Sequence, residues 1–229
     1  LSFLSIGLAL WSALEFNRRK ALLIFAILLM LVIRPHMAGM MILAIGFSTI
    51  VQPNVSAAQR LIVGVISIGA AAIMVPFALD YAGVGAGSSA SDLQSYVETR
   101  QKYNTKGGGG LDISSMSLPM QLFTYLLRPL PFEAHSIPAL AASLDNLVLL
   151  YLLCLGIKAK YRHFFSTKKL TLPGNRHFMW GYVILAWVTL AMTTANLGIS
   201  VRQKWMFIPV LVFLILSLLT NINSSKVHK

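Results

Sequence analysis

The residues best suited to chemistry gather in one short stretch, 117–136, which reads SLPMQLFTYLLRPLPFEAHS. It holds Arg128 between leucines and prolines, followed by Glu133 and His135 two positions apart. An arginine can bind a phosphate group through two parallel hydrogen bonds, and a carboxylate or an imidazole can accept a proton. The stretch therefore predicts a site that holds an anion beside a catalytic base, with Glu133 and His135 as the two candidates.

Four more polar residues stand at the ends of apolar runs: Arg34, His36, Asp80 and Arg202. Arginine suits planar, bidentate recognition of phosphate, which makes Arg34 and Arg202 candidates for binding the same anion. The alternative is that these two arginines anchor the chain at lipid headgroups. His36 and His135 have a structural alternative as well, because many histidines only satisfy local hydrogen bonds.

The composition is typical of an integral membrane protein. Hydrophobic residues make up 56% of the chain and charged residues 11%, whereas soluble domains have roughly a quarter of their residues charged. The mean hydropathy is +0.72. We therefore expect an all-α integral membrane protein, a polytopic helix bundle with about seven membrane segments and an extracytoplasmic loop that contains amphipathic helices.

The apolar runs cover residues 1–14, 21–33, 37–51, 61–81, 137–157, 178–199 and 206–219. The second and third are about 20 Å long as helices, shorter than the roughly 30 Å hydrocarbon core. A single helix through both would place Arg34 near the bilayer centre, at a cost of about 2.5 kcal/mol or more, and Pro35 inside a helix. Two short helices that meet at Arg34 avoid both penalties.

The net charge of +12 comes from basic residues in short loops beside apolar runs, a membrane-topology pattern that does not favour nucleic acid. If the basic turn 18–20 is cytoplasmic and residues 21–51 cross twice, segment 158–176 and the C-terminus are cytoplasmic too. That side then holds twelve of the nineteen lysines and arginines, as the positive-inside rule requires. Residues 82–136 become an extracytoplasmic loop.

This topology places Arg34, Arg128 and Arg202 on the outer side, so we expect their charged ends to converge on one cavity. His36, Asp80, Glu133 and His135 lie on the same side, and His36 and Asp80 are expected to contact the same substrate as the arginines.

Within the outer loop, apolar spacing and an i, i+4 charge pair predict a helix over 92–103. The glycines at 107–110 predict a break. A second helix is expected over 119–128, along the outer membrane surface, because prolines stand at both of its ends.

Two other features concern the last three apolar runs. Asp145 and Asn146 form a polar pair inside one run. Residues 201–204 read as a short turn between the last two.

No metal or nucleotide cofactor is predicted, because the histidines are scattered and the chain has neither paired cysteines nor a glycine-rich phosphate loop. The sequence begins at Leu1 inside an apolar run, without the features of a signal peptide. We expect residues 1–229 to be a single transmembrane domain, the C-terminal part of a longer protein.

Three motifs resemble the C-terminal half of bacterial polytopic polysaccharide polymerases of the O-antigen and exopolysaccharide group. They are RPH at 34–36, LRPLPFEAH at 127–135 and NLGISVRQK at 196–204. The resemblance implies a multi-pass glycosyltransferase of the bacterial inner membrane that works without metal. Its substrate would be an undecaprenyl-pyrophosphate-linked oligosaccharide on the periplasmic face, and Arg34, Arg128 and Arg202 would hold the pyrophosphate.

The expected function is therefore polymerisation or transfer of lipid-linked repeat units in surface polysaccharide synthesis. Expected partners are the lipid-linked oligosaccharide, membrane lipids and other polysaccharide-assembly proteins, with no nucleic acid. Two alternatives stay open: a flippase or transporter of lipid-linked glycans, and a membrane assembly subunit without catalysis.

Overall fold

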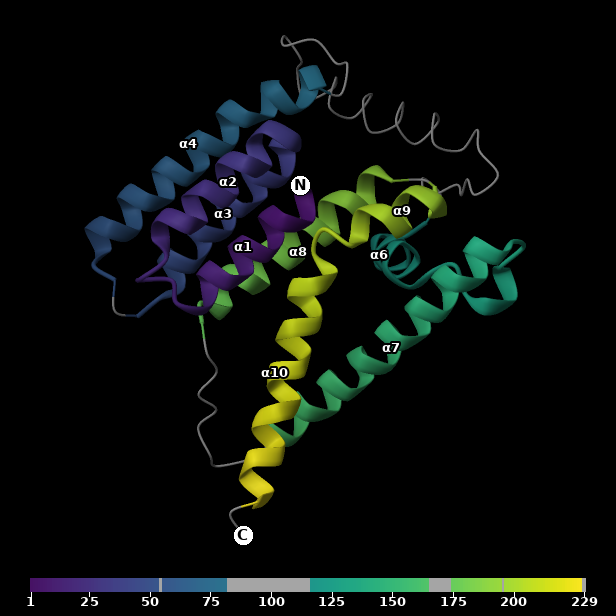
Figure 1. Cartoon of the computed structure of the whole chain (residues 1–229). Coiled ribbons are helices and arrows are strands. Elements are labelled where there is room, and N and C mark those ends of the chain that lie inside the picture. Colours follow the sequence, from purple (N-terminus) through teal and green to yellow (C-terminus); the bar gives the residue numbers. More distant parts are fainter. Residues whose placement is uncertain (54, 82–115, 165–173, 195, 228–229) are drawn as a thin grey trace.

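The structure, a computed structural model, describes residues 1–53, 55–81, 116–164, 174–194 and 196–227 (Figure 1). This part of the chain is all-helical and contains no β-strand, which confirms the expected all-α class. The helix expected at 92–103 and the break expected at 107–110 lie outside the described residues.

The described helices follow the apolar runs closely. They are α1 (Ser2–Leu14), α2 (Lys20–Ile33), α3 (Pro35–Val51), α4 (Ala57–Tyr81), α6 (Leu118–Leu127), the 3-10 helix η1 (Pro131–Glu133), α7 (Ile137–Phe164), α8 (Arg176–Thr193), α9 (Leu197–Lys204) and α10 (Ile208–Val227). Helix α6 confirms the helix expected before Pro129.

The break between α2 and α3 confirms two short helices in place of one long one. Arg34 leaves the helical region, with φ −149° and ψ 82°. Pro35 then begins α3, at a position where its missing N–H removes no helix hydrogen bond. The two helices have 14 and 17 residues and pack against each other.

The region after α8 differs from the expectation. The apolar run 178–199 was expected to form one continuous segment, followed by a turn over 201–204. Both expectations are wrong, because α8 ends at Thr193 and residues 197–204 form α9. The cause is a cap: the Asn196 side chain accepts hydrogen bonds from the N–H groups of Gly198 and Ile199, at 2.9 Å and 3.3 Å. Such a cap starts a new helix regardless of hydropathy.

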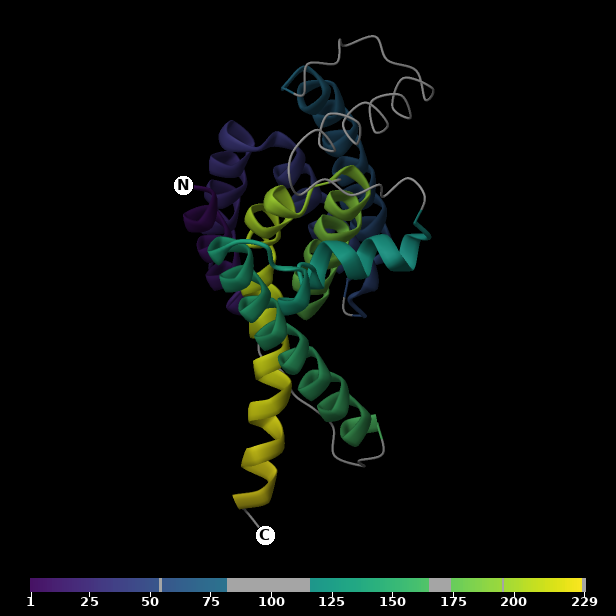
Figure 2. The same ribbon diagram turned by 90° about the vertical axis from the view of Figure 1, so that its right-hand side faces the viewer.

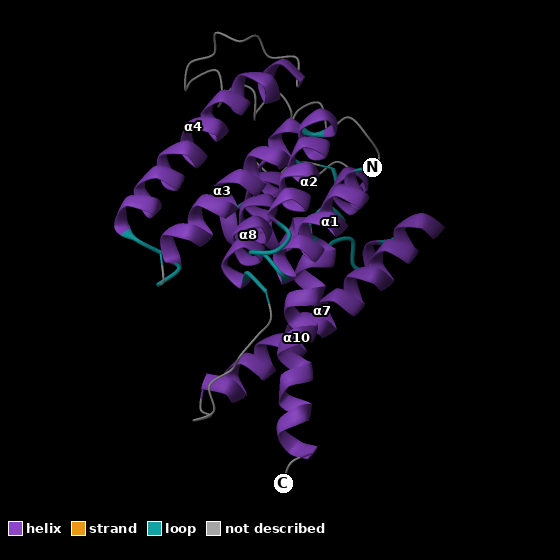
Figure 3. Ribbon diagram, turned by 60° about the vertical axis from the view of Figure 1, so that its left-hand side comes forward, coloured by secondary structure: helices purple, strands orange, loops and turns teal. Residues whose placement is uncertain are grey.

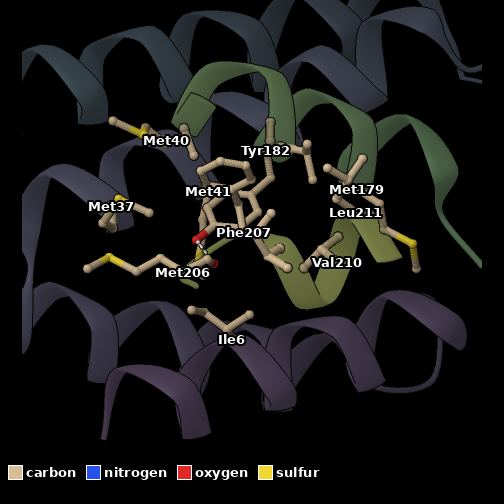
Figure 4. Close-up of a cluster of buried hydrophobic side chains, with 14 of the residues drawn as sticks. Ile6, Met37, Met40, Met41, Met179, Tyr182, Met206, Phe207, Val210 and Leu211 are labelled. Atoms are coloured by element: carbon tan, nitrogen blue, oxygen red, sulfur yellow. Dashed lines mark hydrogen bonds between the residues drawn. The ribbon is translucent and has the colours of Figure 1, made fainter. Parts of the chain in front are cut away.

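The core lies where α8 packs between α3 and the first part of α10, with α1 alongside (Figure 4). Methionines and aromatic rings fill it, among them Met41, Tyr182 and Phe207, each at most 2% exposed. The Tyr182 hydroxyl donates to the carbonyl of Met206 at 3.0 Å. This bond ties α8 to the junction between α9 and α10.

Large apolar side chains also cover the outside of the molecule. On α2, α4 and α7, residues such as Val32, Leu61 and Ile157 are 83%, 69% and 69% exposed. Helices α7 and α10 pack against each other and extend beyond the other helices (Figures 2 and 3).

Within the described residues, one helical segment, 137–161, is long and apolar enough to cross a membrane. The bent pair 197–204 and 208–219 would add a second, while the remaining apolar helical segments have 10–17 residues.

Close packing of α3 on α4 depends on Gly46. A Cβ atom added there would lie 2.6 Å from the Cβ of Ser67, so α3 and α4 would have to separate. We expect Gly46→Ala to lower the free energy of unfolding by about 1–3 kcal/mol, measured by denaturant unfolding of the purified protein in detergent.

The matched control is Gly69→Ala on α4, where an added Cβ meets no atom within 4 Å. Replacing an exposed helical glycine by alanine stabilises by up to about 1 kcal/mol. Equal stabilities for the two variants would contradict this account of the α3–α4 contact.

Candidate functional site

A cavity of about 830 Å³ lies where the end of α6, η1, the start of α7 and helix α9 come together. Four of the predicted site residues line it: Arg128, Glu133, His135 and Arg202. The rest of the lining is mostly apolar, with Phe132, Pro138, Ala139, Ala142, Leu197 and Val201. Charged groups from distant parts of the sequence therefore share one cavity with an apolar surface.

Arg128 is placed by the end of α6. Its N–H still donates to the carbonyl of Thr124 at 3.1 Å, but its own backbone is extended, with φ −95° and ψ 153°. The following Pro129 disfavours a helical residue at this position. The chain therefore leaves α6 at Arg128 and directs this residue to the cavity.

Glu133 reaches back to Arg128 across η1. Its two carboxylate oxygens pair with Nη2 and Nε of Arg128, at 2.7 Å and 2.9 Å. The same carboxylate accepts the N–H of Leu130 at 3.0 Å. This two-pronged pairing fixes the plane of the guanidinium as well as its position.

Three influences act on the Glu133 carboxyl. Burial raises its pKa. The hydrogen bonds from Arg128 and Leu130 and the positive charge of Arg128 together lower the pKa by more than burial raises it, so the net pKa lies below the ordinary 4.5. At neutral pH the group is an ionised carboxylate whose lone pairs are already engaged. That makes Glu133 a weak proton acceptor and an effective support for Arg128.

His135 and Arg202 are both exposed at the cavity. Arg202 lies in the last turn of α9 and has no ion-pair partner among the described residues. One guanidinium is thus neutralised by a fixed carboxylate, and the other is not.

Two further predicted site residues are not brought to this cavity. Arg34 and His36 do not line it, and the charge of Arg34 acts instead on His36 and on Tyr125 of α6. Two of the three arginines converge, therefore, and not all three. Asp80 belongs to α4, but its side chain falls outside the described residues.

Two residues that the sequence did not assign to the site stand behind it. Asn146 of α7 is 1% exposed, and its side-chain amide donates to the carbonyl of Pro129 at 3.0 Å. Lys204, 2% exposed, donates to the Oδ1 atom of Asn146. Asn146 could be recognised from the sequence as a polar residue inside an apolar run. Lys204 could not, because a lysine in the turn expected at 201–204 is unremarkable.

The described residues include no group of three His, Cys, Asp or Glu side chains that could hold a metal ion. The arrangement can instead hold an anion between two guanidinium groups, next to an imidazole and an apolar wall.

No protein-family model, curated protein or solved structure matches this chain.

The Glu133 pairing makes a titration prediction. Because the pKa of Glu133 is lowered, its support of the turn is complete above about 4.5 and is lost as pH falls through the lowered pKa. With ¹³C-carboxyl-labelled glutamate, Glu133 should titrate with a midpoint below 4.5, and Arg128→Met should raise that midpoint.

The chain contains three glutamates, Glu15, Glu98 and Glu133, so Glu133→Gln identifies the relevant signal by its loss. A wild-type midpoint at or above 4.5, or one that Arg128→Met leaves unchanged, would contradict the pairing.

Proposed function

We propose that this cavity binds the pyrophosphate of a lipid-linked oligosaccharide and that the protein transfers or polymerises its glycan in bacterial surface polysaccharide synthesis. The observation that supports the proposal best is the meeting of Arg128 and Arg202, from α6 and α9, in one cavity of about 830 Å³. Arginine binds phosphate oxygens in a planar, bidentate manner, and two such groups suit a pyrophosphate.

The apolar part of the lining supports a lipid-linked substrate over a soluble one. Phe132, Leu197 and Val201 border the same cavity as the two arginines. A soluble sugar nucleotide would gain little from this surface. The first isoprene units of a polyprenyl chain would bury apolar surface against it and so remove that surface from water, which favours binding. The site thus matches an amphiphile with an anionic head.

A membrane location belongs to the same proposal. The exposed apolar side chains of α1, α2, α4 and α7 suit lipid better than water. About seven membrane segments, two of them short and meeting at Arg34, would put residues 82–136 outside and the C-terminus in the cytoplasm. The protein would lie in the bacterial inner membrane beside other polysaccharide-assembly proteins.

In the proposed reaction an acceptor hydroxyl attacks the anomeric carbon of the donor sugar. The bond between that carbon and the pyrophosphate oxygen breaks, and undecaprenyl pyrophosphate leaves with its charge stabilised by Arg128 and Arg202. The acceptor proton passes to His135 as general base. We assign Glu133 to holding Arg128, because its carboxylate is already paired.

Arg34, His36 and Asp80 stay predicted substrate contacts, and no observation ties them to this cavity. The proposed reaction does not require these three residues.

The two arginines give the direct test. In the complete gene, Arg128→Ala and Arg202→Ala should each reduce polymer formation by roughly 100-fold, because each removes a charge that stabilises the leaving group. The measurement is the ladder of surface polysaccharide on a gel, at matched protein levels. Lys158→Ala on α7, an exposed lysine away from the cavity, should leave the ladder normal.

A normal ladder for both arginine variants would overturn the proposal. A strain lacking the gene should accumulate unpolymerised lipid-linked units on the outer leaflet, whereas accumulation on the cytoplasmic leaflet would indicate a flippase.

The assignment of the base separates His135 from Glu133. With purified protein and lipid-linked repeat units, His135→Ala should lower kcat by about 10²- to 10⁴-fold with a smaller change in KM. Glu133→Gln should act mainly on KM, because it loosens Arg128. The reverse pattern would show that Glu133 is the base.

A further inference from the structure

We propose that Lys204 and Asn146 together are positioning residues that hold Arg128 in the anion site, an inference that rests on the proposed function. Neither residue lines the cavity. Both lie behind it, and their hydrogen bonds reach the main chain on the two sides of Arg128.

The starting observation is a lysine that is 2% exposed. Removing an ammonium group from water is strongly unfavourable unless the group finds hydrogen-bond acceptors. Lys204 finds two: the Oδ1 atom of Asn146 on α7 and the carbonyl of Leu126 on α6, the second at 3.4 Å. An apolar residue of similar length would avoid the desolvation penalty, so stability alone gives little reason for a lysine here.

The contact with Leu126 places the lysine charge at the C-terminal end of α6. The last four carbonyls of a helix have no partner within the helix, and a positive charge there is favourable. Leu126 belongs to this last turn, two residues before Arg128. Lys204 therefore fixes the main chain on the helical side of Arg128.

Asn146 fixes the other side. Its Oδ1 atom accepts from Lys204, so its amide nitrogen must point the opposite way, toward the carbonyl of Pro129 at 3.0 Å. Pro129 directly follows Arg128 and lines the cavity. The Arg128 backbone is thus held from Leu126 and from Pro129, while Glu133 holds its guanidinium.

The same lysine ties the second arginine to the first. Lys204 ends α9, the helix that carries Arg202 to the cavity. Through Lys204, α9 is bonded to α6 and to α7. The buried lysine consequently constrains the positions of both arginines, although it does not line the cavity.

The main test separates the two bonds of Asn146. Asn146→Asp keeps an acceptor for Lys204 but replaces the donor to Pro129 with a carboxylate oxygen. Lys204→Met removes both bonds of the lysine at similar length. The matched control is Lys158→Met, at an exposed position of α7.

Binding is measured with the full chain in lipid nanodiscs, using farnesyl diphosphate and farnesol, which differ only in the headgroup. Asn146→Asp, which loses one hydrogen bond, should raise the Kd for farnesyl diphosphate about tenfold, and Lys204→Met, which loses two, should raise it by at least as much. The Kd for farnesol should stay unchanged, because the apolar wall is intact. Lys158→Met should bind both as the wild type does.

Wild-type affinity of Asn146→Asp for farnesyl diphosphate would overturn the positioning role. An equal loss of affinity for both amphiphiles in Asn146→Asp would also overturn it, because that pattern indicates general damage to the fold.

Failure of the proposed function has a different signature: the wild-type protein would bind the two amphiphiles equally. The positioning role is then decided by amide hydrogen exchange over residues 126–134 without ligand. Faster exchange in Asn146→Asp but not in Lys158→Met supports it. Unchanged exchange overturns it, and because this readout uses Asn146→Asp, it does not depend on Lys204→Met folding.

Discussion

The burial of one ammonium group, that of Lys204, is the constraint on which the arrangement around the cavity depends. A charged group removed from water must be surrounded by acceptors, and here they come from two other helices. Once α6, α7 and α9 meet at this point, the residues just before and after their contacts are fixed as well. Arg128 and Arg202 therefore reach the same cavity because of an interaction that lies behind it.

The Arg128–Glu133 pair contributes order more than stability. Its side chains are about a quarter exposed, 25% and 23%, and ion pairs that water can reach add little to the free energy of folding. The pair instead holds the guanidinium of Arg128 in one orientation. Arg202 has no such restraint within the described residues, so it supplies the uncompensated charge that would attract the anion.

The break at Arg34 and the break before α9 have the same physical origin in local backbone chemistry. Proline at the first position of a helix and asparagine at a cap each fix where a helix starts, whatever the hydropathy of the surrounding run. Arg34 lies directly at the first break, and Arg202 lies in the last turn of the short helix that the second break begins. In a bilayer, a helix end is where a charged side chain costs least.

The sequence by itself determined what depends on neighbours along the chain. Composition gave the helical class, Pro35 gave the break after α2, and Pro129 gave the end of α6. The proximity of Arg128 and Glu133 follows from their spacing. The cap at Asn196 is not evident from the sequence, because the residues around it form an apolar run.

Only the tertiary structure decided the rotation and contacts of the helices, because hydropathy does not specify how each helix packs. Asn146 is buried while the adjacent Asp145 is exposed, since successive residues point to different sides of a helix. The packing of α9 against α6 likewise brings Arg202 to the cavity that Arg128 lines, whereas Arg34 does not line it.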